Sequence, residues 1–219
     1  MNFNVAIDGP AGAGKSTVAK IVADKMNMTY IDTGAMYRAI ALLSIKYEKN
    51  NIDDIINLAK KVKIEIHGTR ICINSKDVTN AIRGLEVTNK VSEIAKIPEI
   101  RILMTRLQRQ MAKSKGIVMD GRDIGTTVLP DAKYKFYLTA NVKERAARRY
   151  KELIEDGQKV TLKQIEKDIM QRDRQDKQRA FSPLAVAKDA IIIDNTQKTI
   201  MQVVEEILDW IKRGENIVL

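Results

Sequence analysis

The chain has 219 residues, of which 44% are hydrophobic and 30% are charged, and its formal net charge at pH 7 is +10. This length and composition indicate one globular domain with room for a small insertion, and the positive charge suits partners that carry phosphate, either nucleic acid or small ligands. A single cysteine and a single histidine exclude an intramolecular disulfide and a metal site built from thiolates or several imidazoles, and no apolar run is long enough to span a membrane.

The first predicted elements enclose a phosphate-binding loop. Apolar residues at positions 3, 5 and 7 predict a short strand, and apolar residues recur at helical spacing from Val18 to Met26. Between them the sequence GPAGAGKST has the spacing G-x-x-x-x-G-K-S, in which backbone N–H groups, the lysine and the serine hydroxyl bind phosphates and Mg²⁺. A glycine-rich turn that binds nothing is the alternative, and the flanking strand and helix argue against it. We therefore predict a nucleoside-triphosphate site with a metal ligand at Ser16, formed by Gly9, Pro10, Ala11, Gly12, Ala13, Gly14, Lys15, Ser16 and Thr17.

The remaining elements alternate between short apolar strands and amphipathic helices. Further strands are predicted over residues 28–32, 117–120, 134–139 and 190–194. Helices are predicted over residues 33–47, 52–62, 87–95, 98–111, 142–154, 162–179 and 200–211. Residues 63–74 instead alternate apolar and polar around a Gly68-Thr69 turn, which predicts short antiparallel strands, with 75–78 as a candidate third. The pattern predicts an α/β fold in which helices cover both faces of a parallel sheet.

Several charged side chains have two interpretations when they are taken alone. Arg172, Asp176 and Arg179 fall on one helical face, but such a face is more often a row of solvated ion pairs than a binding site. Arg145 and Arg149 are also one turn apart, and for them a solvated face has equal weight. Asp120 ends a predicted strand, as a magnesium-orienting acid does, although capping of the following turn explains it equally well. Cys72 and Trp210 are expected to pack rather than to react or stack on a ligand.

Five segments together resemble the bacterial cytidylate kinase family along nearly the whole chain: IDGPAGAGKST, YIDTGAMYR, NKVSEIAKIPEIR, MDGRDIGT and RDRQDKQRAFSPL. The resemblance implies a single P-loop nucleoside-monophosphate kinase domain over residues 1–219, with a parallel sheet flanked by helices. The antiparallel insertion, at about 63–85, belongs to the monophosphate-binding part, and a short lid is expected at about 145–160. The implied reaction is phosphorylation of CMP or dCMP by ATP with Mg²⁺, in pyrimidine nucleotide metabolism.

The resemblance also implies roles for individual side chains. Thr33 and Arg38 match positions beside the acceptor monophosphate, and Ser92 and Arg101 match positions that face the cytosine ring. Arg122 and Asp123 match the GRD turn, in which the arginine is expected near phosphate and the aspartate near the base. Asp176 is expected to hold ribose hydroxyls. Arg172 and Arg179 are expected to bind phosphate or sugar oxygens. The residues expected in catalysis are Lys15, Arg122, Arg172 and Arg179. The candidates for lid arginines over ATP are Arg145, Arg148 and Arg149.

Two other functions compete with this interpretation. One is a kinase of the same fold that prefers UMP or AMP, which the base-facing residues Ser92, Arg101 and Asp123 disfavour. The other is an ATP-dependent nucleic-acid-binding protein, which the net charge favours but which lacks a recognisable nucleic-acid module here. We therefore expect small nucleotides as ligands and no nucleic acid, membrane or obligate protein partner. Because the first strand leaves no room for a signal peptide, we expect a cytoplasmic protein.

Overall fold

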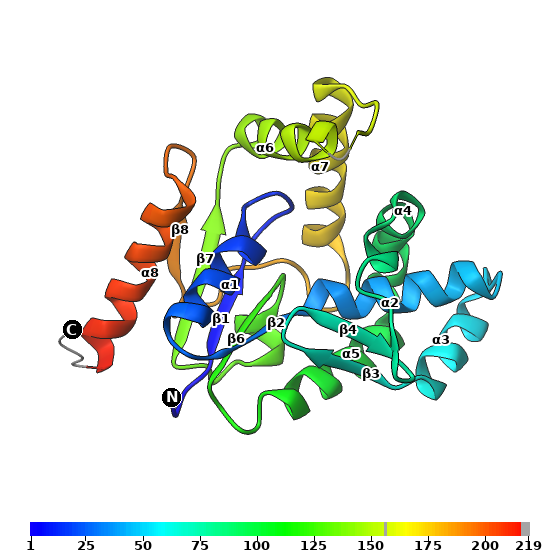
Figure 1. Ribbon diagram of the computed structural model, residues 1–219, viewed down its shortest axis with the longest axis horizontal. Coiled ribbons are helices and arrows are strands. Elements are labelled where there is room, and N and C mark those ends of the chain that lie inside the picture. The colour runs from blue at the N-terminus through cyan, green and yellow to red at the C-terminus, as the bar shows by residue number, and fades with distance from the viewer. Residues whose placement is uncertain (156, 216–219) are drawn as a thin grey trace.

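Figure 1 shows the computed structural model of the chain, which describes residues 1–155 and 157–215. Its centre is a five-stranded parallel sheet with the spatial order β2-β6-β1-β7-β8. The strands are β1 Val5–Asp8, β2 Thr29–Asp32, β6 Ile117–Gly121, β7 Tyr134–Thr139 and β8 Ile191–Asp194. The four later strands begin and end within one residue of their predicted bounds. The predicted parallel sheet is therefore confirmed.

The central strand β1 determines which distant segments of the chain meet. Val5 lies in register with Val118 of β6 on one side and with Tyr134 of β7 on the other. Because all five strands run parallel, their carboxyl ends lie at one edge of the sheet. The phosphate loop follows β1 and the GRD turn follows β6 at that edge. The sheet alone therefore brings these two predicted site segments together.

Both faces of the sheet are covered. Val5 and Ile7 point to one side, where they pack with α1 (Lys15–Lys25) and α8 (Ile200–Glu215). Ala6 points to the opposite side, into a smaller apolar cluster. A strand that is buried on both faces needs apolar residues at successive positions, which is why this strand does not alternate.

A second core lies beside the sheet and is enclosed by four helices. They are α2 Thr33–Lys46, α3 Ile52–Lys61, α4 Leu85–Ile94 and α5 Pro98–Met111. The predicted apolar faces differ from the observed ones at two places. Tyr47 follows the end of α2 and is 51% exposed. In α5, Leu103 and Leu107 are only partly buried, because Arg101 and Gln108 occupy the buried face instead.

The antiparallel insertion predicted after α3 is present. It consists of β3 Ile64–His67, β4 Arg70–Ile73 and the two-residue strand β5 Lys76–Asp77. Cys72 is buried in the middle strand, as expected of a packing residue. A 3₁₀ turn, Ala81–Arg83, connects this small sheet to α4.

Two basic helices, α6 (Val142–Glu155) and α7 (Leu162–Gln178), pack against one another at the top of Figure 1. Their contact has its own small apolar cluster, which includes Ala146 and Ile169. Near the sheet edge, the segment Ile124–Val128 forms one π-helical turn, η2. Within residues 1–155 and 157–215, no helix combines the length and the apolar character that crossing a membrane requires.

Candidate active site

The phosphate loop joins β1 to α1 at the carboxyl edge of the sheet. Its first glycine cannot be replaced, because a Cβ at Gly9 would lie 2.0 Å from the carbonyl oxygen of Leu138. Gly12 and Gly14 have φ values of 72° and 77°, which side chains rarely adopt. Ala13 is buried, and its carbonyl oxygen accepts a hydrogen bond from Asn195 Nδ2 at 2.8 Å. The strand, loop and helix succeed one another as the sequence predicts.

Lys15 is buried at the start of α1. Its Nζ donates a hydrogen bond to the carbonyl oxygen of Pro10 at 2.7 Å, so that the side chain folds back over its own loop. Burial, together with the positive charge of Arg122, lowers the pKa of Lys15 to about 7. A phosphate beside this ammonium group would replace the carbonyl oxygen and raise the pKa again.

An acidic side chain faces the first turn of α1. Ser16 Oγ and the hydroxyl of Tyr30 each donate a hydrogen bond to the carboxylate of Asp120, both at 2.9 Å. Burial and the negative charge of Asp32 raise the pKa of Asp120 to about 6. A hydroxyl and carboxylates held close together are hard oxygen donors of the kind that Mg²⁺ prefers. The local chemistry therefore fits a magnesium ion. Thr33 Oγ1 donates to the backbone carbonyl of the same residue at 2.7 Å.

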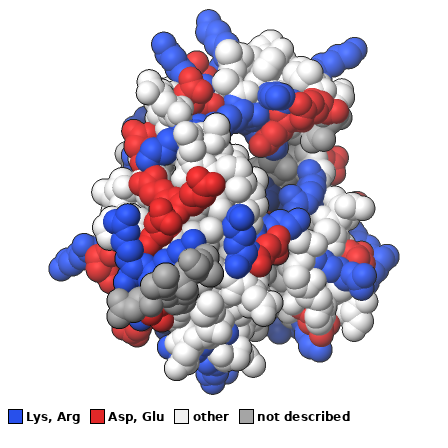
Figure 2. Space-filling model, turned by 60° about the vertical axis from the view of Figure 1, so that its left-hand side comes forward, with Lys and Arg blue, Asp and Glu red and all other residues white. Residues whose placement is uncertain are grey.

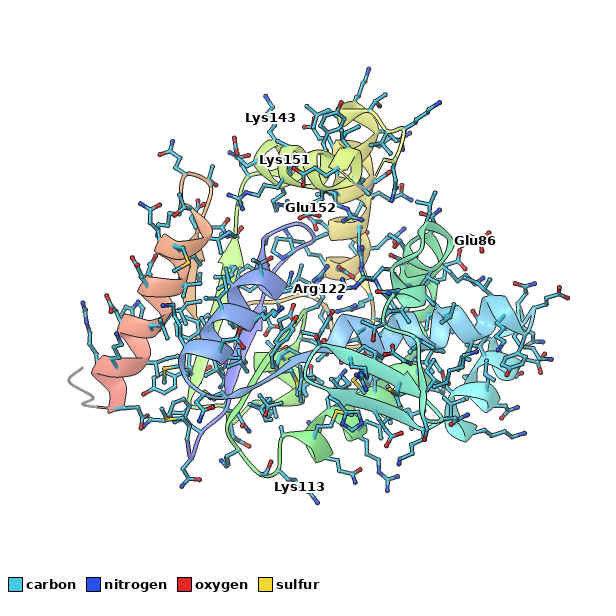
Figure 3. All side chains as sticks on the ribbon, viewed as in Figure 1. Glu86, Lys113, Arg122, Lys143, Lys151 and Glu152 are labelled. Carbon is cyan, nitrogen blue, oxygen red and sulfur yellow. The ribbon has the colours of Figure 1, made fainter. Side chains whose placement is uncertain are left out.

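Four arginines from separate elements come together next to the loop. We call Arg38, Arg122, Arg149 and Arg172 the arginine cluster. Burial and the positive charges of Arg122, Arg38 and Arg149 lower the pKa of Arg172 to about 10, and burial lowers that of Arg38. Figure 3 shows Arg122 near the centre of the molecule, below α7 and beside α2.

The arginine cluster holds more positive charge than its ion pairs neutralise. Arg122 Nε lies 2.8 Å from Asp176 Oδ2, and Arg149 pairs with Glu152 at 2.9 Å. Among the described residues, Arg38 and Arg172 form no ion pair. Like-charged guanidinium groups that lie close together favour anions as ligands, and two oxygens of a phosphate group can accept from the planar fork of an arginine.

The residues expected to face the base form a second network. Arg101 Nη2 lies 2.7 Å from Asp123 Oδ2, and the two side chains are only 2% and 7% exposed. Arg179 Nη1 contacts Asp176 at 3.3 Å and its Nη2 lies 4.0 Å from Asp123. Within the described part of the chain, Arg101 Nε and Arg179 Nη2 are buried without a hydrogen-bond partner. Such donors favour a ligand that supplies acceptors. Ser92 lies half-buried on α4.

The arginines expected in the lid differ among themselves. Arg145 is 4% exposed and pairs with Asp173 at 2.7 Å, while it also donates hydrogen bonds to backbone carbonyls of the loop and of residue 140. Arg148 donates to the side chain and carbonyl of Asn195. Of these residues, Arg149 alone belongs to the arginine cluster. A contact between Arg145 and ATP is therefore less favoured than the sequence indicates, because protein groups already occupy its guanidinium.

Sequence reasoning did not single out Asp173, Asp8 or Arg83, whose roles depend on distant partners. Asp173 accepts a hydrogen bond from Ala11 N at 3.1 Å, and Asp8 accepts two from the segment after Asp123. Arg83, from the turn before α4, adds positive charge near Arg38. Asp8 and Asp173 lie within segments that resemble the family, and this location could have identified them as candidates from the sequence.

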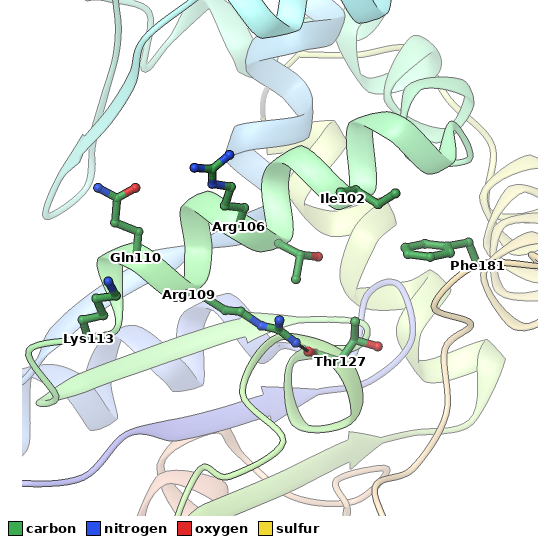
Figure 4. A pocket seen from close by; sticks show the side chains of 8 residues that line it. Ile102, Arg106, Arg109, Gln110, Lys113, Thr127 and Phe181 are labelled. Carbon is green, nitrogen blue, oxygen red and sulfur yellow. Dashed lines mark hydrogen bonds between the residues drawn. The ribbon is translucent and has the colours of Figure 1, made fainter.

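A hollow of about 630 Å³ lies outside this constellation, between α5, η2 and the segment after α7 (Figure 4). Ile102, Arg106, Lys113 and Phe181 are among the residues that line it, and none of the predicted site residues does. One wall includes Arg109, whose guanidinium donates hydrogen bonds to the carbonyls of residues 127 and 128. The candidate site is therefore defined by the converging charged groups and not by this hollow.

A phosphate loop between a parallel strand and a helix, an acid on the neighbouring strand and converging arginines define a P-loop phosphotransferase. The fold agrees with solved structures: a gluconokinase from Sinorhizobium meliloti has a TM-score of 0.51 and 12% identity, covering 99% of this chain and 97% of its own. An uncharacterized protein from Eubacterium ventriosum has a TM-score of 0.53 and 15% identity, covering 96% of this chain and 99% of its own.

More specific relationships come from sequence. The family model described as cytidylate kinase matches residues 5–213. A cytidylate kinase of Desulforamulus reducens is 51% identical, with 96% of this chain and 97% of the relative covered. One from Alkaliphilus oremlandii is 52% identical, with 95% and 97% covered. The chain belongs to the cytidylate kinase family and is a phosphotransferase.

Replacing Arg172 with glutamine is expected to stabilise the ligand-free protein, because it removes one of several like-charged guanidinium groups that lie close together. At low ionic strength without phosphate, we expect the thermal unfolding midpoint to rise by about 2 to 4 °C. Added pyrophosphate should then stabilise the variant less than the unmodified protein. Arg174→Gln is the matched control, since Arg174 lies exposed on the same helix. A midpoint for Arg172→Gln below that of the control would contradict a repulsive cluster.

Proposed function

We propose that this protein transfers the γ-phosphoryl group of ATP to CMP and dCMP, which yields ADP with CDP or dCDP in pyrimidine nucleotide metabolism. The observation that carries the proposal is the arginine cluster: the charges of Arg122 and Arg172 act on Lys15 of the phosphate loop, and Arg122 is next in sequence to Asp123 of the buried Arg101–Asp123 pair. Membership of the cytidylate kinase family supports the choice of acceptor. The cluster provides cations where the phosphates of donor and acceptor must meet.

The proposed donor half consists of residues Gly9 to Thr17. Lys15 releases the carbonyl oxygen of Pro10 and binds the β- and γ-phosphates, which raise its pKa and keep it protonated at neutral pH. Ser16, with Asp120 behind it, would hold Mg²⁺, which when bound neutralises charge on the β- and γ-phosphates.

The proposed acceptor half uses the two networks described above. Thr33, Arg38 and Arg122 lie beside the monophosphate, and Asp176 with Arg172 and Arg179 holds the ribose and phosphate oxygens. Ser92, Arg101 and Asp123 face the base. Cytosine presents a donor amine at N4 where uracil presents an acceptor carbonyl, so a carboxylate favours cytosine. The buried donors of Arg101 and Arg179 would be satisfied by acceptors of the same nucleotide.

The transfer itself requires positioning more than acid–base chemistry. An oxygen of the acceptor phosphate attacks the γ-phosphorus, a new P–O bond forms, and the bond to the β-phosphate oxygen breaks to release ADP. The attacking oxygen is already ionised at pH 7, so that no general base has to remove a proton. Lys15 and the arginines stabilise the negative charge spread over the transferring group.

We also propose the domain organisation that the family resemblance implies. The chain forms one domain, with residues 63–85 as an insertion on the monophosphate side and residues about 145–160 as a lid that excludes water. Residue 156, within that lid, lies outside the described residues. In this proposal the protein works in the cytoplasm on small nucleotides, without nucleic acid, a membrane or an obligate protein partner.

Two rival functions have less support. Figure 2 shows Lys and Arg side chains interspersed with Asp and Glu over the face that it presents, rather than a continuous basic stripe for nucleic acid. A UMP kinase on the same fold would not need a buried carboxylate at the base, because uracil has no amine to donate to it. Asp123, which is 5% exposed, thus separates CMP from UMP, whereas adenine also carries an amine and differs from cytosine in its larger ring system.

Lys15→Ala should abolish most phosphoryl transfer, because the ammonium group then no longer stabilises charge on the β- and γ-phosphates. The expected loss in kcat is about 2 to 4 kcal/mol, as for removal of one donor to a developing anion. A coupled assay of ADP release measures it, and circular dichroism checks the fold. Lys20→Ala, on the exposed side of α1, is the control. Near-normal turnover of a folded Lys15→Ala protein would refute the donor assignment.

Asp123→Ala should reduce activity with CMP far more than activity with UMP. We expect the ratio of their kcat/KM values to narrow by about tenfold, which corresponds to about 1.4 kcal/mol. The reason is that the carboxylate accepts from the N4 amine but opposes a carbonyl in that place. Asp131→Ala, at an exposed position, is the control. Equal losses for both acceptors would instead assign Asp123 to its ion pair with Arg101.

A further inference from the structure

Asp8 ends the central strand β1 and is 4% exposed. Its Oδ1 accepts a hydrogen bond from the N–H of Ile124 at 2.8 Å, and its Oδ2 accepts one from Gly125 at 2.7 Å. These residues begin η2 and directly follow Asp123. A Cβ on Gly125 would lie 3.4 Å from Asp8 Oδ2, which is an ordinary van der Waals contact, and 3.3 Å from Cδ of Lys135.

Asp173 lies on α7 and is 9% exposed. Its Oδ1 accepts a hydrogen bond from the N–H of Ala11 at 3.1 Å, and its Oδ2 lies 2.7 Å from Nη1 of Arg145. The same Nη1 donates to the carbonyl oxygen of Ala11 at 2.7 Å. The polar backbone groups of one residue in the phosphate loop are thus held by side chains of α6 and α7.

Each of these two carboxylates belongs to one half of the proposed site and accepts hydrogen bonds from the backbone of the other half. Asp8 belongs to the strand that leads into the phosphate loop, yet it holds the turn that carries Arg122 and Asp123. Asp173 lies beside Arg172 on the helix of the acceptor half, yet it holds the phosphate loop. Each half is therefore fixed by a side chain of the other, so the distance between the two phosphate sites is set from both sides.

We infer that Asp8 and Asp173 are positioning residues for opposite halves of the reaction, Asp8 for the acceptor nucleotide and Asp173 for the donor nucleotide. The inference rests on the proposed function. Phosphoryl transfer needs the attacking oxygen in line with the breaking bond, and misplacement by about 1 Å costs about a hundredfold in rate. The hydrogen bonds of Asp8 and Asp173 support that alignment, although neither side chain contacts a nucleotide.

Asparagine substitutions test the inference because they keep the volume of each side chain. At Asp8, an amide provides one acceptor oxygen and turns an NH₂ group towards a backbone N–H, so one of two hydrogen bonds is lost. At Asp173, the change removes the negative charge opposite Arg145, and the NH₂ group then faces either the guanidinium of Arg145 or the N–H of Ala11, so one of these two contacts is also lost. The matched controls are Asp24→Asn on α1 and Asp168→Asn on α7, both at exposed positions.

Steady-state kinetics on the full chain should distinguish the role of Asp8 from that of Asp173. Each nucleotide is varied while the other, with Mg²⁺, is held at saturation. For Asp8→Asn we expect KM for CMP to rise about tenfold while KM for ATP changes by less than about threefold. For Asp173→Asn we expect the opposite pattern, and for both controls no change. If these residues served stability alone, each variant would have a lower thermal unfolding midpoint, but its KM for CMP and its KM for ATP would not change selectively.

The inference is wrong if either variant changes both KM values equally, or changes neither. If Asp8→Asn does not fold, Asp8→Glu keeps the charge but displaces the two acceptor oxygens by one methylene, and should raise KM for CMP selectively. If Asp173→Asn does not fold, Arg145→Lys keeps the charge but loses the forked contact, and should raise KM for ATP selectively. Absence of CMP-dependent ADP release from the unmodified protein would refute the proposed function instead, so the two failures are distinguishable.

Discussion

The gathering of four partly exposed, like-charged guanidinium groups beside the phosphate loop is the constraint on which the site depends. The arginine cluster gathers side chains from α2, from the turn after β6, and from both α6 and α7, although its ion pairs involve only Asp176 and Glu152. Desolvation and like-charge repulsion lower the pKa of Arg172, whereas neighbouring carboxylates raise the pKa of Arg122. Such an excess of positive charge suits a protein whose ligands bring phosphate, because bound phosphate reduces the repulsion.

The strand order explains why the phosphate loop and the turn that carries Arg122 lie close together. With β1 between β6 and β7, the phosphate loop and the GRD turn emerge side by side at the same edge. Asp120 at the end of β6 then faces Ser16 at the start of α1. The helices α6 and α7 contact the phosphate loop at Ala11 through Arg145 and Asp173. The loop, the GRD turn and these two helices are thus connected by side-chain hydrogen bonds and ion pairs.

The sequence predicted the parts of the molecule that depend on local pattern. The strand bounds, the phosphate loop and the antiparallel insertion follow from apolar periodicity and from glycine spacing. Contacts between distant segments were not predictable in this way. The turn η2 is π-helical because Asp8, 116 positions earlier, holds its first N–H groups. Leu103 and Leu107 lose the buried face of α5 because Arg101 is required beside Asp123, and periodicity alone cannot show which polar residue has a buried partner.

The central claim is that the two buried networks select a cytidine monophosphate as the acceptor. The most direct test is kcat/KM of the full chain with MgATP and each of CMP, dCMP, UMP, AMP and GMP, measured by coupled ADP release. We predict that CMP and dCMP exceed UMP by at least about a hundredfold, since uracil presents a carbonyl where the buried carboxylate needs a donor. We predict that they also exceed AMP and GMP, because a purine is larger than the pyrimidine ring. Equal values for UMP or AMP, or ADP release that does not depend on any acceptor, would contradict the claim.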